Sequence, residues 1–254
     1  MNRTRRQLLA GMSIAGAGAL LVGCRGAGSS ARNEESKKEE APPDNTDEQG
    51  SATITPTEDL MREHGILRRA LLVYQESASK LRGNWSAIAP DNLEKTAQLF
   101  RSFGEDYHEK RLEEAYIFPA LKKTAGPAAV YADALMAQHA RGREITDYVL
   151  SVTAAEKIAS ASMAAFIGAL ESFVRMYAHH AAIEDTIVFP AWKMTMSDQQ
   201  LDEMGEKFEE IEHELFGEDG FEAAVKRIAD IEESLGIANL GGFTAPPPPE
   251  VVKK

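Results

Sequence analysis

The chain has 254 residues, of which 43% are hydrophobic and 27% charged, and its formal net charge at pH 7 is −12. This length allows one globular domain with a sizeable buried core, with or without appendages. The acidic balance argues against nucleic acid and against an anionic lipid surface as binding partners.

Residues 1–24 have the pattern of an export signal. Arg5 and Arg6 lie in a Thr-Arg-Arg-Gln-Leu-Leu segment that resembles a twin-arginine signal, and residues 10–22 are a small, apolar run too short to span a membrane. The following Leu-Val-Gly-Cys, which ends at Cys24, resembles a bacterial lipobox. We therefore expect an exported protein of the periplasm or cell envelope, anchored to the membrane only through a lipid on Cys24. A plain secretory signal with a chance cysteine is the alternative.

Cys24 is the single cysteine of the chain. A mature protein that begins at this residue has no pair of thiols for a disulfide and no thiolate metal site. Any metal site in the folded region must therefore be built from His and carboxylate side chains.

Two segments with few large apolar side chains flank the central region. Residues 25–56 are mainly Gly, Ser, Glu, Lys and Pro, which cannot bury enough surface to offset chain entropy, so a disordered tether is expected. Residues 241–254 include four consecutive prolines and predict an irregular Pro-rich tail. The folded domain is expected over residues 57–240.

The central region is predicted to be helical throughout. A capping box at Thr55–Glu58, with Pro56 at the first helical position, opens a helix that ends near Gly83. Further helices are predicted over residues 90–123, 130–157 and 162–194, and shorter ones over residues 197–216 and 221–235. Four long helices with short turns predict an all-α fold, an antiparallel four-helix bundle with the shorter C-terminal helices packed outside it.

The histidines are spread along the helices in a way that matters more than their number. One falls on each long helix: His64, His108, His139 and His180. Residues near the middle of separate helices can converge on one point, which is how bundles build metal sites. Glu184 follows His180 at i+4, which places an imidazole and a carboxylate about 6 Å apart on one face. His179 is a possible further ligand, although it is expected beside the site or exposed, and His213 is expected on the solvated face.

The second long helix has a less regular spacing. Glu113 follows His108 by five residues, so a regular α-helix would turn it about 140° away from the histidine. A kink or loosened turn would bring it back, and Pro119 just beyond can contribute to one. Glu109 is the alternative carboxylate ligand, in place of Glu113 or beside it.

The two acid-bearing segments repeat one another. Residues 113–120, Glu-Glu-Ala-Tyr-Ile-Phe-Pro-Ala, match residues 184–191, Glu-Asp-Thr-Ile-Val-Phe-Pro-Ala, 71 positions later. The second and fourth long helices would then present equivalent carboxylates about a pseudo-two-fold axis. Such carboxylates suit the bridging of two divalent ions, whose charge needs negative groups nearby in a low-dielectric core. A carboxylate-rich site without thiols favours iron over zinc, with manganese as a second candidate.

The order of these motifs resembles the hemerythrin-like His-His-Glu (HHE) cation-binding family over about residues 57–215. The resemblance implies a four-helix bundle that holds a carboxylate-bridged di-iron centre, with a bridging oxygen between its two iron ions. The implied ligands are His64, His108, Glu113, His139, His180 and Glu184. The oxygen carriers of the family have a second histidine one turn after the third-helix ligand, where this chain has Arg143. One iron would therefore have fewer imidazoles.

Members of this family bind dioxygen, sense small molecules or handle iron, and we expect a binding protein rather than an enzyme. Its ligand would be dioxygen or a related small molecule. The alternative is a di-iron enzyme, namely an oxidase, a peroxidase or a nitric-oxide-related iron-centre repair protein, because the thinner imidazole set leaves a coordination position open. A metal-free structural bundle is the third interpretation.

Overall fold

The computed structural model describes residues 54–249 except residues 85–86, 156 and 218–219, all within the unit Ile54–Lys254. The predicted signal over residues 1–24, the lipobox Cys24 and residues 25–53 of the predicted tether lie outside the described residues. No helix among the described residues is long and apolar enough to cross a membrane.

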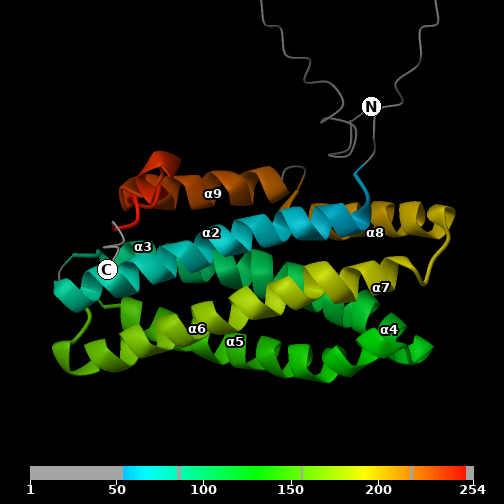
Figure 1. Cartoon of the computed structure of the whole chain (residues 1–254), viewed down its shortest axis with the longest axis horizontal. Helices are drawn as coiled ribbons and strands as arrows, with labels where there is room; N and C mark the ends of the chain where they lie inside the picture. Colours follow the sequence, from blue (N-terminus) through cyan, green and yellow to red (C-terminus); the bar gives the residue numbers. More distant parts are fainter. Residues whose placement is uncertain (1–53, 85–86, 156, 218–219, 250–254) are drawn as a thin grey trace, which may run out of the picture. The chain divides into compact units, whose positions relative to one another are not determined.

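Four long helical segments form an antiparallel bundle, and the described residues contain no strand (Figure 1). The first segment is α2, Pro56–Gly83. The second segment consists of α3 Pro90–Leu99, η2 Phe100–Ile117 and α4 Phe118–Thr124. The third is α5 Ala132–Thr153, which follows the 3-10 turn η3 Pro127–Tyr131. The fourth consists of α6 Met163–Ile183, η5 Glu184–Val188 and α7 Phe189–Lys193, and follows the 3-10 turn η4 Ser160–Ser162. Helix α2 packs against α6, and α3 packs against α5. The predicted fold class is confirmed.

Two shorter helices follow the bundle. Helix α8, Asp198–Phe216, packs against α2 and η2, and α9, Gly220–Ser234, packs against α2 and α3 (Figure 1). A 3-10 turn, η6 Leu240–Phe243, comes last, and residues 241–249 are exposed. The C-terminal helices thus lie outside the four long segments, as predicted.

Local sequence signals set most helix boundaries. Both predicted capping boxes form, one at Thr55 with Glu58 and one at Ser197 with Gln200. The third long helix is shorter than predicted, because α5 ends at Thr153 rather than near residue 157. Val149 and Thr153 are its last buried positions, and the next ones in that stripe would be Glu156 and Lys157, which offer no apolar side chain to bury.

The repeated Phe-Pro segments widen the helix in the same way. Segments η2 and η5 are π-helical, and the backbone N–H of Phe118 donates to the carbonyl of Glu113 as that of Phe189 donates to the carbonyl of Glu184. A proline has no N–H, and its ring clashes with the carbonyl four residues earlier, so a wider turn accommodates it. Each acid of the repeat therefore lies at the start of a widened turn.

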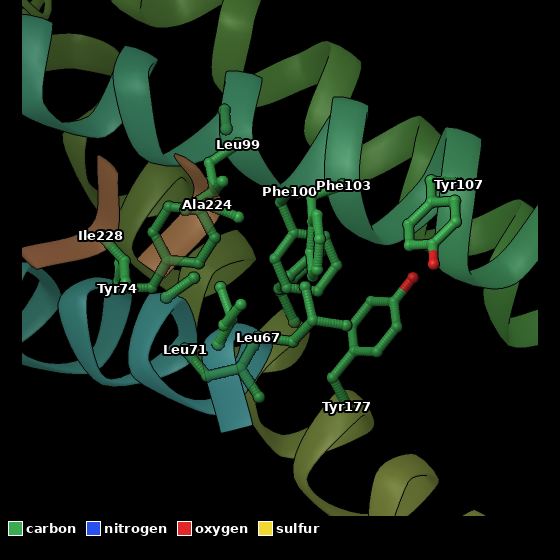
Figure 2. Close-up of a cluster of buried hydrophobic side chains, with 14 of the residues drawn as sticks. Leu67, Leu71, Tyr74, Leu99, Phe100, Phe103, Tyr107, Tyr177, Ala224 and Ile228 are labelled. Atoms are coloured by element: carbon green, nitrogen blue, oxygen red, sulfur yellow. The ribbon is translucent and has the colours of Figure 1, made fainter. Parts of the chain in front are cut away.

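An aromatic cluster fills the core beside this region (Figure 2). The ring of Phe100 lies 4.8 Å from that of Phe173 and 4.9 Å from that of Tyr177, in edge-on contacts. Side chains from η2, α2, α6 and α9 meet there, so one cluster joins the bundle to a C-terminal helix.

Phe100→Ala is expected to lower the free energy of unfolding by about 3–5 kcal/mol, because it leaves a cavity among buried rings. Urea unfolding followed by circular dichroism measures this change. Phe243→Ala is the matched control, since Phe243 is partly exposed in the last 3-10 turn. A loss for Phe100→Ala of only about 0.5 kcal/mol, the size of a surface substitution, would contradict the assignment of this cluster to the core.

Candidate metal centre

Four buried imidazoles meet inside the bundle as two facing pairs. The Nε2 atoms of His64 on α2 and His108 on η2 lie 3.0 Å apart. Those of His139 on α5 and His180 on α6 lie 3.1 Å apart. Each long segment thus supplies one imidazole, and all four Nε2 atoms point toward the interior of the bundle.

Two carboxylates span the two imidazole pairs. Glu113 places Oε1 3.4 Å from Nε2 of His108 and Oε2 3.3 Å from Nε2 of His139. Glu184 places Oε2 3.1 Å from Nε2 of His180 and 3.5 Å from Nε2 of His64. Each carboxylate therefore contacts one histidine of each pair, which is the arrangement that bridging of two cations requires.

The π-helical turn explains how Glu113 reaches this position. Its backbone carbonyl accepts from Phe118, five residues on, and the five-residue step also brings Glu113 back to the face of His108. The spacing that is too long for an α-helix therefore fits η2. Glu184 needs only the ordinary i+4 step from His180, because α6 is regular up to Ile183.

The oxygens of Glu113 and Glu184 are buried, and within the described part of the chain none of the four accepts a hydrogen bond of regular geometry. A buried carboxylate without partners costs several kcal/mol unless a positive charge compensates it. Ligand atoms of Glu113, His139, His180 and Glu184 lie within 4.8 Å of one another, as do those of His64, His108 and Glu113. The residues present fit two cations, one at each imidazole pair.

The outward nitrogen of every imidazole bonds to an oxygen acceptor. The Nδ1–oxygen distances are 2.7–2.9 Å, in the pairs His64–Asp185, His108–Glu63, His139–Glu114 and His180–Gln138. An oxygen that accepts from Nδ1 fixes the proton there and leaves the Nε2 lone pair for a metal ion. It also fixes the plane of the ring.

The acceptors follow the pseudo-two-fold symmetry of the bundle. Each one is the sequence neighbour of a candidate ligand on another segment: Glu63 precedes His64, Gln138 precedes His139, Glu114 follows Glu113, and Asp185 follows Glu184. None of these four residues is among the ligands predicted from the sequence. The signal that could have identified them is that each is a polar residue next to a candidate ligand in the sequence.

The centre as a whole has an excess of negative charge. Seven buried or half-buried carboxylates surround the imidazoles: Glu63, Glu105, Glu109, Glu113, Glu114, Glu184 and Asp185. Three guanidinium groups bond to them: Arg68 to Asp185, Arg101 to Glu105, and Arg143 to Glu109 and Glu114. With neutral imidazoles and ionised carboxylates, four negative charges are left over, which is the charge that two divalent cations would neutralise.

Glu109 lies beside the imidazole pairs, with one oxygen 3.9 Å from Nδ1 of His139, but its hydrogen bonds are made away from the Nε2 atoms. One of its oxygens accepts from the hydroxyl of Tyr177 at 2.7 Å, and the other accepts from Nη2 of Arg143 at 3.2 Å. Arg143 also donates to Glu114 at 2.7 Å, so it does not point toward the Nε2 atoms. The structure therefore places Glu113, not Glu109, between the imidazoles. His179 is exposed and lies outside the cluster.

Gly142 makes room for the hydroxyl of Tyr177. A Cβ atom at position 142 would lie 2.0 Å from the Tyr177 hydroxyl oxygen, which no real side chain tolerates. Glycine thus lets Tyr177 reach Glu109 across α5, and this contact completes the polar wall on one side of the centre.

Without a metal ion, protons take part in holding the second imidazole pair together. Burial and the charge of His139 lower the pKa of His180 to about 4. Burial also opposes a charge on His139, but Glu109 and Glu113 outweigh it and raise its pKa to about 10. At neutral pH, His139 would therefore carry the charge of this pair and His180 would be neutral.

The first pair and the carboxylates behave in a similar way. Burial opposes a charge on His108, but Glu113 and Glu63 raise its pKa well above the ordinary value. Burial and the charge of Glu113 raise the pKa of Glu184 well above its ordinary range. Without a metal ion, these groups therefore tend to hold protons at neutral pH.

Comparison with known proteins agrees with this geometry. Residues 55–192 match the family model described as the hemerythrin HHE cation binding domain. The chain is also similar to an uncharacterised protein of Mycobacterium bovis and to uncharacterised proteins from two strains of Mycobacterium tuberculosis. Each is 44% identical over 203 residues, which are 80% of this chain and 78% of the relative. No solved structure matches the chain.

Metal uptake at neutral pH is expected to release about three protons per chain, one from each imidazole pair and one from Glu184, because the metal and the proton compete for Nε2 and for the carboxylate. His139 stays protonated below a pKa of about 10 in the metal-free protein, so apparent metal affinity should rise as pH rises from about 6 to 9. Calorimetric titration with Fe²⁺ under anaerobic conditions, in two buffers of different ionisation enthalpy, counts the protons. His139→Gln should release about one fewer, whereas His179→Ala should not change the number. An affinity that does not depend on pH would contradict this account.

Proposed function

The chain belongs to the hemerythrin HHE cation-binding family, and from this membership we propose that it holds two iron ions and binds dioxygen or a related small molecule at them. The ions would lie one at each imidazole pair, with Glu113 and Glu184 bridging them together with a solvent-derived oxygen. Manganese is a second candidate metal. The observation that carries the proposal is the pair of buried carboxylates that lie between four inward Nε2 atoms and accept no hydrogen bond of regular geometry.

Bound iron would supply the electrons and the open coordination position that reversible binding of dioxygen needs. The chain's own residues hold and shield that site. Asp185 and Glu63 fix the rings of the first pair, and their negative charge makes the imidazoles better donors.

Phenylalanines from the repeated Phe-Pro segments cover the imidazoles. Phe189 stacks on His64 with ring centres 5.3 Å apart, and Phe118 lies against His139 at 5.5 Å. Both phenylalanines are buried, so they keep water away from the metal ligands. Exclusion of water would limit side reactions of a ligand bound at this site.

We further propose that the protein acts in the periplasm or cell envelope, as a lipoprotein attached through Cys24. This part rests on the twin-arginine and lipobox resemblance of residues 1–24. The twin-arginine route carries folded proteins, so iron could be loaded in the cytoplasm before export. Mass spectrometry of the mature protein tests the anchor, because an uncleaved or unlipidated N-terminus would contradict it.

A second candidate function is catalysis on the same ligands, by an oxidase, a peroxidase or a nitric-oxide-handling repair protein. Two observations favour it. Each metal position would have only two imidazole ligands. The buried Tyr177 also lines a small cavity beside the imidazoles. Stopped-flow spectra of the reduced protein separate the two functions: a long-lived, reversible oxygen adduct supports binding, whereas steady turnover of peroxide or nitric oxide supports catalysis.

The proposed centre is tested by iron content. Purified wild-type protein loaded with Fe²⁺ should retain about two iron ions per chain. His180→Ala and Glu113→Ala should each retain fewer iron ions, because each substitution removes a proposed metal ligand. His179→Ala, which removes the neighbouring exposed histidine, should retain both. No retained iron in the wild type, or equal iron in His180→Ala, would contradict the proposal and favour a metal-free structural bundle.

A further inference from the structure

A small cavity lies beside the imidazole pairs, lined from α2, η2 and α6. Its volume is about 10 Å³, which is room for one water-sized molecule. Apart from the candidate ligands, its walls are formed by Leu67, Arg68, Leu71, Glu109, Tyr177 and Ala181. Every lining residue is buried except Arg68, whose side chain is 44% exposed. The cavity therefore meets solvent at Arg68.

The two halves of the centre differ at this place, although the bundle repeats itself. Arg68 follows His64 by four residues, as Arg143 follows His139. Each arginine bonds to the acid that holds its own helix's histidine, Asp185 for Arg68 and Glu114 for Arg143. The arginines are therefore equivalent in position.

Their surroundings are not equivalent. Beside Arg143, the guanidinium also donates to one oxygen of Glu109, and the hydroxyl of Tyr177 donates to the other. The residue after His180, which corresponds to Glu109, is Ala181. With a methyl group in place of a carboxylate, the half that contains Arg68 keeps an open space with apolar walls.

We propose that Arg68 is a specificity-determining residue at the entrance of this cavity, and that it favours small inorganic anions on their way to the metal centre. The inference rests on the proposed function, because the metal centre is what the anion would reach. The guanidinium, which is 44% exposed, is the cationic group of the cavity lining, and although Asp185 pairs with it, low-dielectric walls strengthen its attraction for an entering anion. Leu67 and Leu71 restrict the size of the passage.

Asp185 holds the guanidinium in place. The same carboxylate accepts from Nδ1 of His64 at 2.7 Å, so the entrance and the first metal position share one anchor. An anion at the mouth competes with Asp185 for Arg68. Small neutral molecules make no such contact, and their entry depends only on the size of the passage.

The test compares an anionic and a neutral probe. Azide binding to the oxidised, iron-loaded protein and nitric oxide binding to the reduced protein are followed optically in stopped-flow experiments. Arg68→Gln should weaken azide binding about fivefold, the effect of removing one unit charge a few ångströms from the ligand at a solvent-exposed position. The same substitution should leave the association rate of nitric oxide unchanged or raise it. The azide association rate of the wild type should also fall with salt more steeply than that of the variant.

Two variants serve as controls. Arg69→Gln removes the same charge from the next residue, but Arg69 bonds to Glu232 on α9 and does not line the cavity. It should bind azide as the wild type does. Arg68→Lys keeps the charge and should recover most of the azide affinity.

Iron content separates failure of this inference from failure of the proposed function. If wild type and Arg68→Gln hold the same amount of iron and bind azide equally, the proposed role of Arg68 is wrong, whereas the proposed metal centre is not contradicted. Equal losses of azide and nitric oxide binding in Arg68→Gln would also overturn the entrance, since they indicate structural damage rather than charge selection. A wild type that holds no iron would overturn both.

Discussion

The structure depends on two carboxylates, Glu113 and Glu184, buried between two facing imidazole pairs without hydrogen bonds of their own. Desolvation of such groups is costly, so the bundle is built to offset it. The four imidazoles face the carboxylates, each ring is fixed by an outer acceptor, and two ions would supply the missing positive charge. The HHE family to which the chain belongs provides the fold, and this cluster gives the fold its function.

The two halves of the bundle use the same elements to build the centre. The two acid-bearing turns, their Phe-Pro segments and the outer acceptors correspond in the two halves. The halves differ in the residues that lie beside the imidazole pairs. Glu109 and Tyr177 form a hydrogen-bonded wall of the small cavity beside the imidazoles, and Ala181 and Arg68 line the same cavity.

Much of this arrangement could be predicted from the sequence, because it follows from local signals. Capping residues and apolar periodicity give the helices, and one histidine on each long helix gives the convergence. The π-helical winding of the 18 residues Phe100–Ile117 could not be predicted in its extent, because it depends on packing around Pro119 as well as on the proline itself. The Nδ1 acceptors were also missed, because each holds a ring on another helix and such partners are set by tertiary structure. Helix α5 was predicted too long, because its apolar stripe stops one turn earlier.

The central claim is that the facing imidazoles and the two shared carboxylates hold two metal ions. Anomalous diffraction from crystals of the iron-loaded protein, recorded on both sides of the iron absorption edge, tests it most directly. The account predicts two iron peaks, one beside Nε2 of His64 and His108 and one beside Nε2 of His139 and His180, with Glu113 and Glu184 next to both. A single peak, or a peak among Glu109, Glu114 and Nδ1 of His139, would contradict it.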